Sequence, residues 1–276
     1  MTFTIGRPEP RLRPIVGRYT GYEERVAGVE CRRELPGSKA VFLVGWGDPL
    51  DVAHPRAPGS AATGVTSFTG GLFDAYAETT FTGVGRGVQL MLDPFDAGRL
   101  FGLPIGELAN RVVPLDVLPG GWARDLAARL AEAPGWPSRF ALLDAAFVAR
   151  LADAPSPDRR VEWAWRRLCR SHGRVAVGTL AAEVGWSRRH LAASFRRELG
   201  LTPKVAARVL RFAHAYAVAS SPSRAPGGGA GAGGEGWAGV AAACGYHDQA
   251  HLIRDFRKFA GTTPGRISTI RPEHAG

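Results

Sequence analysis

The sequence predicts an α+β fold: a small β-barrel-like domain with packed helices, then an all-α domain with two helix-turn-helix units joined by a long helix. Short apolar and aromatic runs punctuated by Gly, Pro and Asp occupy residues 11–92, a pattern typical of antiparallel strands joined by turns. Apolar stripes at helical spacing follow these runs. A segment that begins at His190 recurs at His251, so the second half contains an internal repeat.

Length and composition bound the class of protein. With 276 residues, 45% of them apolar, the chain can bury the core of one large domain or of two ordinary ones. The longest bulky apolar run, residues 40–44, is far shorter than the roughly 20 residues of a membrane-spanning helix. Residues 1–14 hold no apolar stretch of signal-peptide length. We therefore expect a cytoplasmic protein without a membrane partner.

The charge is divided unequally along the chain. Two prolines and small polar residues at 152–158 predict a linker between a domain at 1–151 and a domain at 159–276. Residues 1–157 contain 16 Lys and Arg against 17 Asp and Glu, a net charge of −1, whereas the remainder contains 19 against 8, a net charge of +11. An acidic partner is therefore expected for the second domain alone.

The elements of the first domain follow from its apolar runs. Strands are expected within residues 15–22, 40–46, 71–81 and 87–92. Amphipathic helices are expected at residues 93–101, 121–131 and 137–151. The GVGRG sequence at 83–87 resembles a phosphate-binding loop only superficially, and we interpret it as a turn between strands. Aromatic side chains could enclose a small-molecule pocket here, although such residues more often fill a core; they are Phe42, Trp46, Phe73 and Tyr76.

The second domain is predicted to be helical throughout. Val161, Trp165 and Leu168 form one apolar stripe, and a long helix should run from Pro203 to about Ala219. Residues 220–236 are mostly Gly, Ala, Ser and Pro. Such a stretch can neither hold a helix nor fill a core, which predicts a flexible insertion.

The repeat has the form His-Leu-x3-Phe-Arg-basic-x2-Gly-x-Thr-Pro, beginning at His190 and again at His251. An Ala-rich segment that ends in Gly and an aromatic residue precedes each copy. The pattern predicts a short helix, a Gly in the left-handed conformation of a tight turn, a capping residue (Ser187 or Asp248) and a second helix. This is the description of a helix-turn-helix, present twice.

Helical spacing separates the two faces of each second helix. The inward stripes are Leu191, Phe195 and Leu199 in the first copy and Leu252, Phe256 and Phe259 in the second. Arg, Gln, Ala and Ile lie on the outward stripes. Arg can bond guanine through two donors, Gln can bond adenine, and Ala or Ile can touch a thymine methyl group. One basic stripe could be a solvated helix face, but two in matching register favour contact with the DNA major groove.

These residues resemble the DNA-binding domain of the AraC/XylS family of bacterial transcription regulators. The resemblance covers residues 159–270 and is strongest in GWSRRHLAASFRRELGLTPK and ACGYHDQAHLIRDFRKFAGTTP. It implies a seven-helix domain whose two recognition helices enter successive major grooves of duplex DNA, roughly 34 Å apart. We therefore expect a sequence-specific transcription regulator that is not an enzyme and has no cofactor.

The resemblance also implies which residues contact DNA. Base contacts would fall on Arg188, Arg189, Ala192, Ala193, Gln249, Ala250, Ile253 and Arg254. Family members often have polar residues where this chain has alanine, so hydrogen-bonded readout should rest mainly on Arg189, Gln249 and Arg254. Contacts to phosphate are expected from Ser187, Arg196, Lys204 and Arg257.

The first half is similar to the amino-terminal sensory domains of some AraC-family members, through ELPGSKAVFLVGWGDPLDV and GVGRGVQLMLDPFDAGRLFGLP. This similarity implies an effector-sensing or dimerisation domain at 1–151. The expected partners are double-stranded DNA, a small-molecule effector whose binding residues are unknown, RNA polymerase and a second copy of the chain. Whether the protein activates or represses transcription is open.

Three alternative interpretations of the sequence compete with the regulator. His247 and His251 mimic a zinc-protease motif, but Asp248 is needed as a helix cap and places the two imidazoles off a common helix face, so no metal site is expected. Cys31 lies beside two arginines that could lower its pKa, as in a redox or alkylation sensor or a DNA-repair protein, although a strand cysteine is more often packed. An architectural DNA binder would leave the first domain without a role.

Overall fold

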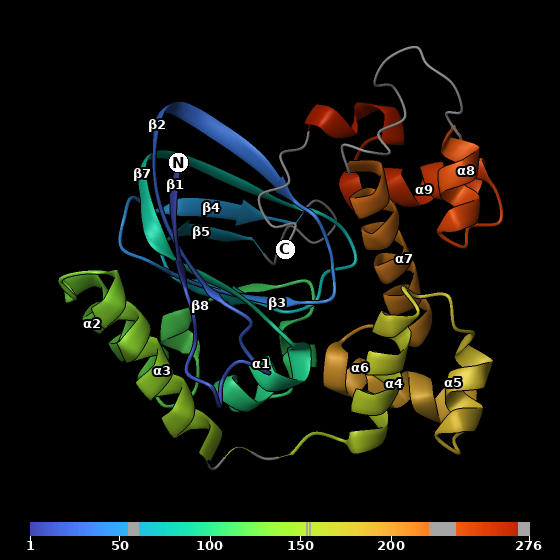
Figure 1. Cartoon of the computed structure of the whole chain (residues 1–276), viewed down its shortest axis with the longest axis horizontal. Helices are drawn as coiled ribbons and strands as arrows, with labels where there is room; N and C mark the ends of the chain where they lie inside the picture. Colours follow the sequence, from blue (N-terminus) through green and yellow to red (C-terminus); the bar gives the residue numbers. More distant parts are fainter. Residues whose placement is uncertain (55–60, 153, 155, 221–235, 270–276) are drawn as a thin grey trace.

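The chain forms a curved antiparallel sheet with helices in its first half and a helical second half (Figure 1). This computed structural model describes residues 1–54, 61–152, 154, 156–220 and 236–269. The predicted α+β class is confirmed. Residues 221–235, nearly all of the predicted insertion, lie outside the described part of the chain. Within that part, no helix combines the length and apolarity needed to cross a membrane.

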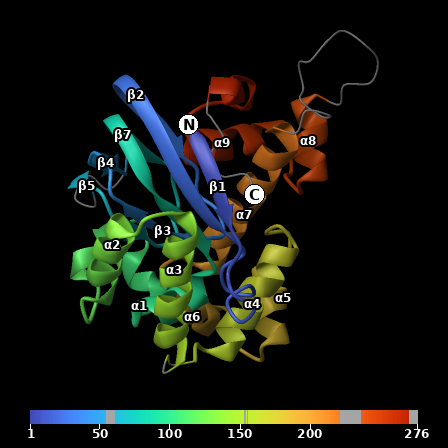
Figure 2. The same cartoon turned by 60° about the vertical axis from the view of Figure 1, so that its left-hand side comes forward.

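The described strands form one sheet. Their bounds are β1 (Thr2–Gly6), β2 (Tyr19–Glu34), β3 (Ala40–Gly45), β4 (Leu50–Ala53), β5 (Ala62–Val65), β6 (Phe68–Gly70), β7 (Ala77–Leu92) and β8 (Val112–Pro114). The order is β1-β2-β7-β3-β6-β8, with β4 paired to both β7 and β5. Strands β2 and β7 are the longest and pair with each other, while β3 and β4 pair with opposite halves of β7. Figure 2 shows β1 beside β2 at the edge of the sheet.

The two faces of the sheet bury different groups. Phe42, Val88 and Leu90 pack against a layer of helices, and Phe42 stacks on Trp122 with ring centroids 6.0 Å apart. Leu43 faces the opposite, concave side. The alternation of side chains along a strand explains this division. The covering helices are α1 (Pro94–Phe101), α2 (Trp122–Glu132) and α3 (Trp136–Ala152), close to the three helices that the sequence predicts.

Several details of the predicted sheet were wrong. The GVGRG sequence lies inside β7 and is not a turn, because alternate glycines leave room for large side chains of β2: a Cβ at Gly87 would lie 2.8 Å from the Tyr22 hydroxyl, and one at Gly85 would lie 3.1 Å from Cγ of Glu24. The strand expected at 71–81 begins only at Ala77. Strands β1, β4, β5, β6 and β8 were not predicted, since each contains only three to five residues and so carries little alternating pattern.

The second half contains two helix-turn-helix units. The helices are α4 (Arg159–Arg170), α5 (Val177–Glu183), α6 (Arg188–Leu199), α7 (Pro203–Ser220), α8 (Trp237–Ala243) and α9 (Gln249–Ala260), followed by the 3-10 turn η4 (Pro264–Thr269). Helices α5 and α6 form what we call the first unit, α8 and α9 form the second unit, and α7 connects them. Gly185 and Gly245 have φ angles of 70° and 76°, as the predicted turns require. All six residues of the predicted inward stripes are buried.

The hydrophobic core joins the two halves of the chain unevenly. One continuous cluster runs from Phe42 and Leu90 of the sheet to Leu191 and Phe195 of the first unit. A separate cluster holds the second unit together and includes Phe212 of α7. The first unit therefore shares one hydrophobic core with the sheet domain, whereas the second unit has a core of its own.

Candidate nucleic-acid interface

In the first unit, the structure exposes most of the residues predicted to contact bases. Ser187 caps α6 by accepting a hydrogen bond from the backbone N–H of His190 at 3.1 Å. Arg188, Arg189 and Ala193 are exposed, and Ala192 is half-buried. The guanidinium of Arg188 is folded back against α5, where it lies over Gly178. Arg189, the next residue of α6, is exposed.

The second unit repeats this arrangement. The Asp248 carboxylate accepts the backbone N–H of His251 at 2.6 Å, and this hydrogen bond, with a further contact to His247, lowers the pKa of the carboxyl group. Gln249, Ala250 and Arg254 are exposed and Ile253 is half-buried. The outward stripe predicted for α9 is thus present on the surface.

The repeated histidines have a packing role that the sequence pattern did not specify. The His190 ring packs edge-on against Trp186 with centroids 4.4 Å apart, and the His251 ring packs edge-on against Tyr246 at 5.1 Å. Each histidine therefore packs the turn of its unit against the first turn of the second helix of that unit. This contact explains why the aromatic residue and the histidine recur together.

The predicted phosphate-contacting residues are also on the surface. Ser187, Arg196, Lys204 and Arg257 are all exposed. Among the described residues, no ion-pair partner is present for Arg196, Lys204 or Arg257. Cations that are not neutralised within the protein can neutralise phosphate and release its counterions.

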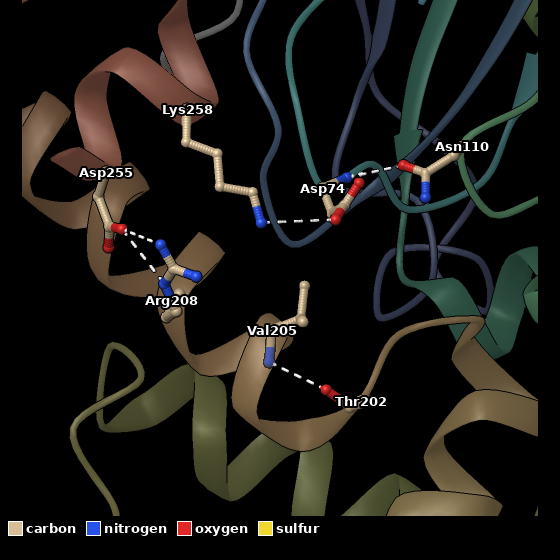
Figure 3. A network of polar contacts seen from close by, with 7 residues as sticks. All are labelled: Asp74, Asn110, Thr202, Val205, Arg208, Asp255 and Lys258. Atoms are coloured by element: carbon tan, nitrogen blue, oxygen red, sulfur yellow. Dashed lines mark hydrogen bonds and ion pairs between the residues drawn. The ribbon is translucent and has the colours of Figure 1, made fainter. Parts of the chain in front are cut away.

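Two arginines of α7 form hydrogen bonds with the second unit and with the segment beside the first unit. Arg208 donates two hydrogen bonds to Oδ1 of Asp255 in α9, whose side chain is fully buried (Figure 3). Arg211 donates to the carbonyl of Gly173, 3.3 Å away beside the first unit, and to that of Gly245, 3.5 Å away in the turn of the second unit. The sequence alone gave no sign that Asp255, on a basic helix, would be buried.

The structure shows the surroundings of the two alternative chemical sites, the histidine pair and Cys31. His247 lies in the turn before α9, with Nδ1 3.2 Å from the Asp248 carboxylate, and the described residues contain no cluster of His, Cys, Asp and Glu suited to a metal. Cys31 is exposed on β2, so its expected packing role was wrong. Its neighbours Arg32 and Arg33 are engaged with Glu24, Glu30 and Glu78.

A cavity of about 720 Å³ lies between the concave side of the sheet and α7. Its sheet wall includes Tyr22, Leu43 and Val52, and its other wall includes Phe212 and Tyr216 of α7. The volume falls in the range of small-molecule sites. No motif predicted this cavity, because its lining comes from several strands, from the continuous segment 32–39 and from α7. Of the four aromatics noted in the sequence, Phe73 lines it and Phe42 faces the opposite layer.

Two residues of β2 that line the cavity, Glu24 and Arg32, form an ion pair. The Arg32 guanidinium donates to both carboxylate oxygens of Glu24 at 3.0 and 2.7 Å, and its centre lies 4.8 Å from the centroid of the Phe81 ring. Burial raises the pKa of Tyr22, and the neighbouring Glu24 charge adds to this effect. The cavity therefore offers a mostly apolar surface with a few fixed polar groups.

The architecture, a curved antiparallel sheet followed by two helix-turn-helix units, has counterparts among solved structures of AraC-like proteins. The chain is similar in fold to ToxT from Vibrio cholerae, an AraC-family regulator: the ToxT structure with bound (E)-4-(8-methylnaphthalen-1-yl)but-3-enoic acid has a TM-score of 0.50 and 7% sequence identity, covering 98% of this chain and 100% of that one. At that identity the likeness shows the fold alone.

Two further solved structures give weaker matches. A second ToxT structure from Vibrio cholerae has a TM-score of 0.48 and 8% identity, covering 91% of this chain and 98% of that one. The AraC-like transcriptional activator CuxR has a TM-score of 0.33 and 19% identity, covering 72% and 80% of the two chains. No family model matches the sequence, and no curated protein matches it.

Proposed function

We propose that this protein is a sequence-specific transcription regulator that binds duplex DNA through α6 and α9 and is controlled by a small molecule. The observation that supports this most strongly is the pair of equivalent recognition helices, each capped, each with a buried apolar stripe and each with arginine on the exposed stripe. Residues 159–276 would read DNA, and residues 1–151 would sense the effector.

Arg189 and Arg254 are expected to read bases. Replacing either by alanine should cost about 1–3 kcal/mol of binding free energy and relax preference at one base position each, because an arginine bonds guanine through two donors. Binding of the full chain to a pool of duplexes, sequenced before and after selection, measures both effects. Arg124→Ala, an exposed position on α2, is the matched control. Equal weakening on every sequence would instead make these arginines phosphate contacts.

The cavity is the proposed effector site because one of its walls belongs to the DNA-binding half. Phe212 and Tyr216 line the cavity and also belong to the core of the second unit. A ligand that contacts both walls would favour one arrangement of sheet and α7 over another, which is the requirement for an effect on DNA binding. The acid bound to ToxT indicates the kind of molecule to test: an apolar ring system with one polar end.

The ToxT ligand, (E)-4-(8-methylnaphthalen-1-yl)but-3-enoic acid, is expected to raise the unfolding temperature of the full chain. At a concentration 100 times its dissociation constant, it should add about 2.7 kcal/mol to the free energy of unfolding. Ala77 lines the cavity and is 6% exposed, so Ala77→Trp should occupy ligand volume and abolish the shift. Val117→Trp, at a position 63% exposed, should leave it intact. Equal shifts in both variants would place the ligand elsewhere.

A further inference from the structure

Both recognition helices end at equivalent positions of the repeat, and the amino-terminal half covers both ends. Gly200 follows α6 and Gly261 follows α9, with φ angles of 72° and 66°. The left-handed conformation favours glycine at each position. Two different loops of the sheet domain contact the two glycines: the loop with Gly106 contacts Gly200, and the loop with Tyr76 contacts Gly261.

The first contact joins two backbones directly. Gly106 lies in the 3-10 turn η2 (Ile105–Leu108), and a Cβ placed there would be 2.5 Å from the carbonyl oxygen of Arg197 and 2.8 Å from the amide nitrogen of Gly200. Real side chains do not approach so closely. Only glycine at position 106 therefore permits η2 to rest on the end of α6.

The second contact is made by an aromatic ring and an ion pair. A Cβ at Gly261 would lie 2.6 Å from Cε1 of Tyr76, so the tyrosine ring rests against this glycine. The Arg33 guanidinium lies 4.9 Å from the centre of the Tyr76 ring and donates to the carbonyl of Ala260 at 3.4 Å. Lys258 of α9 lies 3.6 Å from the carboxylate of Asp74 (Figure 3).

The two contacting loops are bonded to each other. The side-chain oxygen of Asn110 accepts the backbone N–H of Asp74 at 2.8 Å, and the backbone N–H of Asn110 donates to Leu72 at 3.0 Å. The N–H of Gly71 donates to Leu108 at 3.1 Å. Residues 71–76 and 105–110 thus form one hydrogen-bonded unit, which we call the clamp.

We propose that the clamp sets the separation of the two recognition helices by holding both at their carboxyl ends. The second unit has its own core, separate from that of the first, so their relation otherwise depends on α7 and its arginines. The predicted base-contacting residues lie in the opposite, amino-terminal halves of α6 and α9 and are not covered by the clamp. The clamp can therefore stay closed while DNA is bound.

The clamp also meets the proposed effector site. Gly71 and Phe73 belong to the clamp and line the cavity. A molecule in the cavity would touch the loop that holds α9, and so could alter the spacing between the units. This inference rests on the proposed function for its consequence on DNA, but the spacing itself can be measured without DNA.

The spacing can be measured between spin labels on Ala182 of α5 and Ala243 of α8, both exposed, in a full-length background whose three cysteines are replaced. Asp74→Lys and Lys258→Asp should each broaden the distance distribution, because each places like charges together. The double exchange of the two residues should restore it. Asp116→Lys, the same charge change at an exposed site outside the clamp, should have no effect.

Two glycine-to-alanine variants test the contact between Gly106 and the end of α6. Gly106→Ala should broaden the distribution in the same way, whereas Gly17→Ala, where the structure leaves open space around the new methyl group, should not. Unchanged distributions in Asp74→Lys and Gly106→Ala, or failure of the double exchange to restore the spacing, would overturn the proposal. Circular dichroism of each variant separates a change of spacing from unfolding.

DNA binding gives an independent readout. If an open clamp leaves the correct spacing populated one time in ten, affinity for a site that engages both units falls about tenfold. Affinity for a single half-site should stay the same, and the double exchange should recover the loss. If the wild-type chain binds no DNA, the proposed function fails, whereas the label distances still decide whether the clamp sets the spacing.

Discussion

Raising the salt concentration from 50 to 200 mM is expected to weaken DNA binding by the full chain at least about fortyfold. The logarithm of affinity falls with that of salt by about 0.9 for each phosphate neutralised. Arg196, Lys204 and Arg257 are the three predicted phosphate-contacting cations, and all are exposed. Together they give a slope of about −2.7, which corresponds to that loss over a fourfold change in salt.

Single substitutions show which residues contribute to the dependence of DNA affinity on salt concentration. Arg196→Ala and Arg257→Ala should each make the slope shallower by about one and weaken binding on all sequences alike. Arg124→Ala should leave it unchanged, because this exposed residue lies on α2 in the neutral half of the chain. Fluorescence anisotropy on a labelled duplex at several salt concentrations measures the slope. A salt-independent affinity would contradict the electrostatic basis of the proposed function.

Arg208→Met is expected to lower the free energy of unfolding by about 3 kcal/mol, the lower end of the cost of leaving one charge of a buried ion pair without its partner, because the Arg208 side chain is itself 32% exposed. Asp255 is 0% exposed, its Oδ1 accepts both hydrogen bonds from Arg208, and its Oδ2 has no hydrogen-bond partner among the described residues. Removing the guanidinium leaves that carboxylate buried and uncompensated. Urea unfolding followed by circular dichroism measures the loss.

The double variant is the control for this prediction. Arg208→Met combined with Asp255→Leu removes both charges, and replacing a buried pair by apolar residues of similar volume is often neutral. We therefore expect the double variant to recover most of the stability. If the free energy of unfolding of Arg208→Met lies within about 1 kcal/mol of the wild-type value, Asp255 does not depend on Arg208, because breaking a buried ion pair usually costs more than that.

The helical half was predictable because its signals are local. Ser187, Asp248 and the glycines of both turns lie within a few residues of the elements they shape, and the repeat supplied each signal twice. The sheet was harder, since the glycines of β7 are explained by Tyr22 and Glu24, which lie some sixty residues away in the sequence. Nothing near positions 83–87 distinguishes that requirement from a turn.

The candidate site also has some features that the local sequence predicts and others that it does not. Exposure of Arg189, Gln249 and Arg254 followed from helical periodicity and one buried stripe. The cavity, the buried Asp255 and the contact of Gly106 with Gly200 depend on how distant segments meet. Periodicity reports which face of a helix is buried, but not which segment buries it.

Selection of binding sites from random duplex DNA by the full chain tests the central claim most directly. The selected sequences should contain two preferred blocks whose centres are about 10 base pairs apart, one helical turn, because α6 and α9 would enter successive major grooves. Arg189→Ala should degrade one block and Arg254→Ala the other. No enrichment, or enrichment of a single block sensitive to only one arginine, would contradict a regulator that reads DNA with both units.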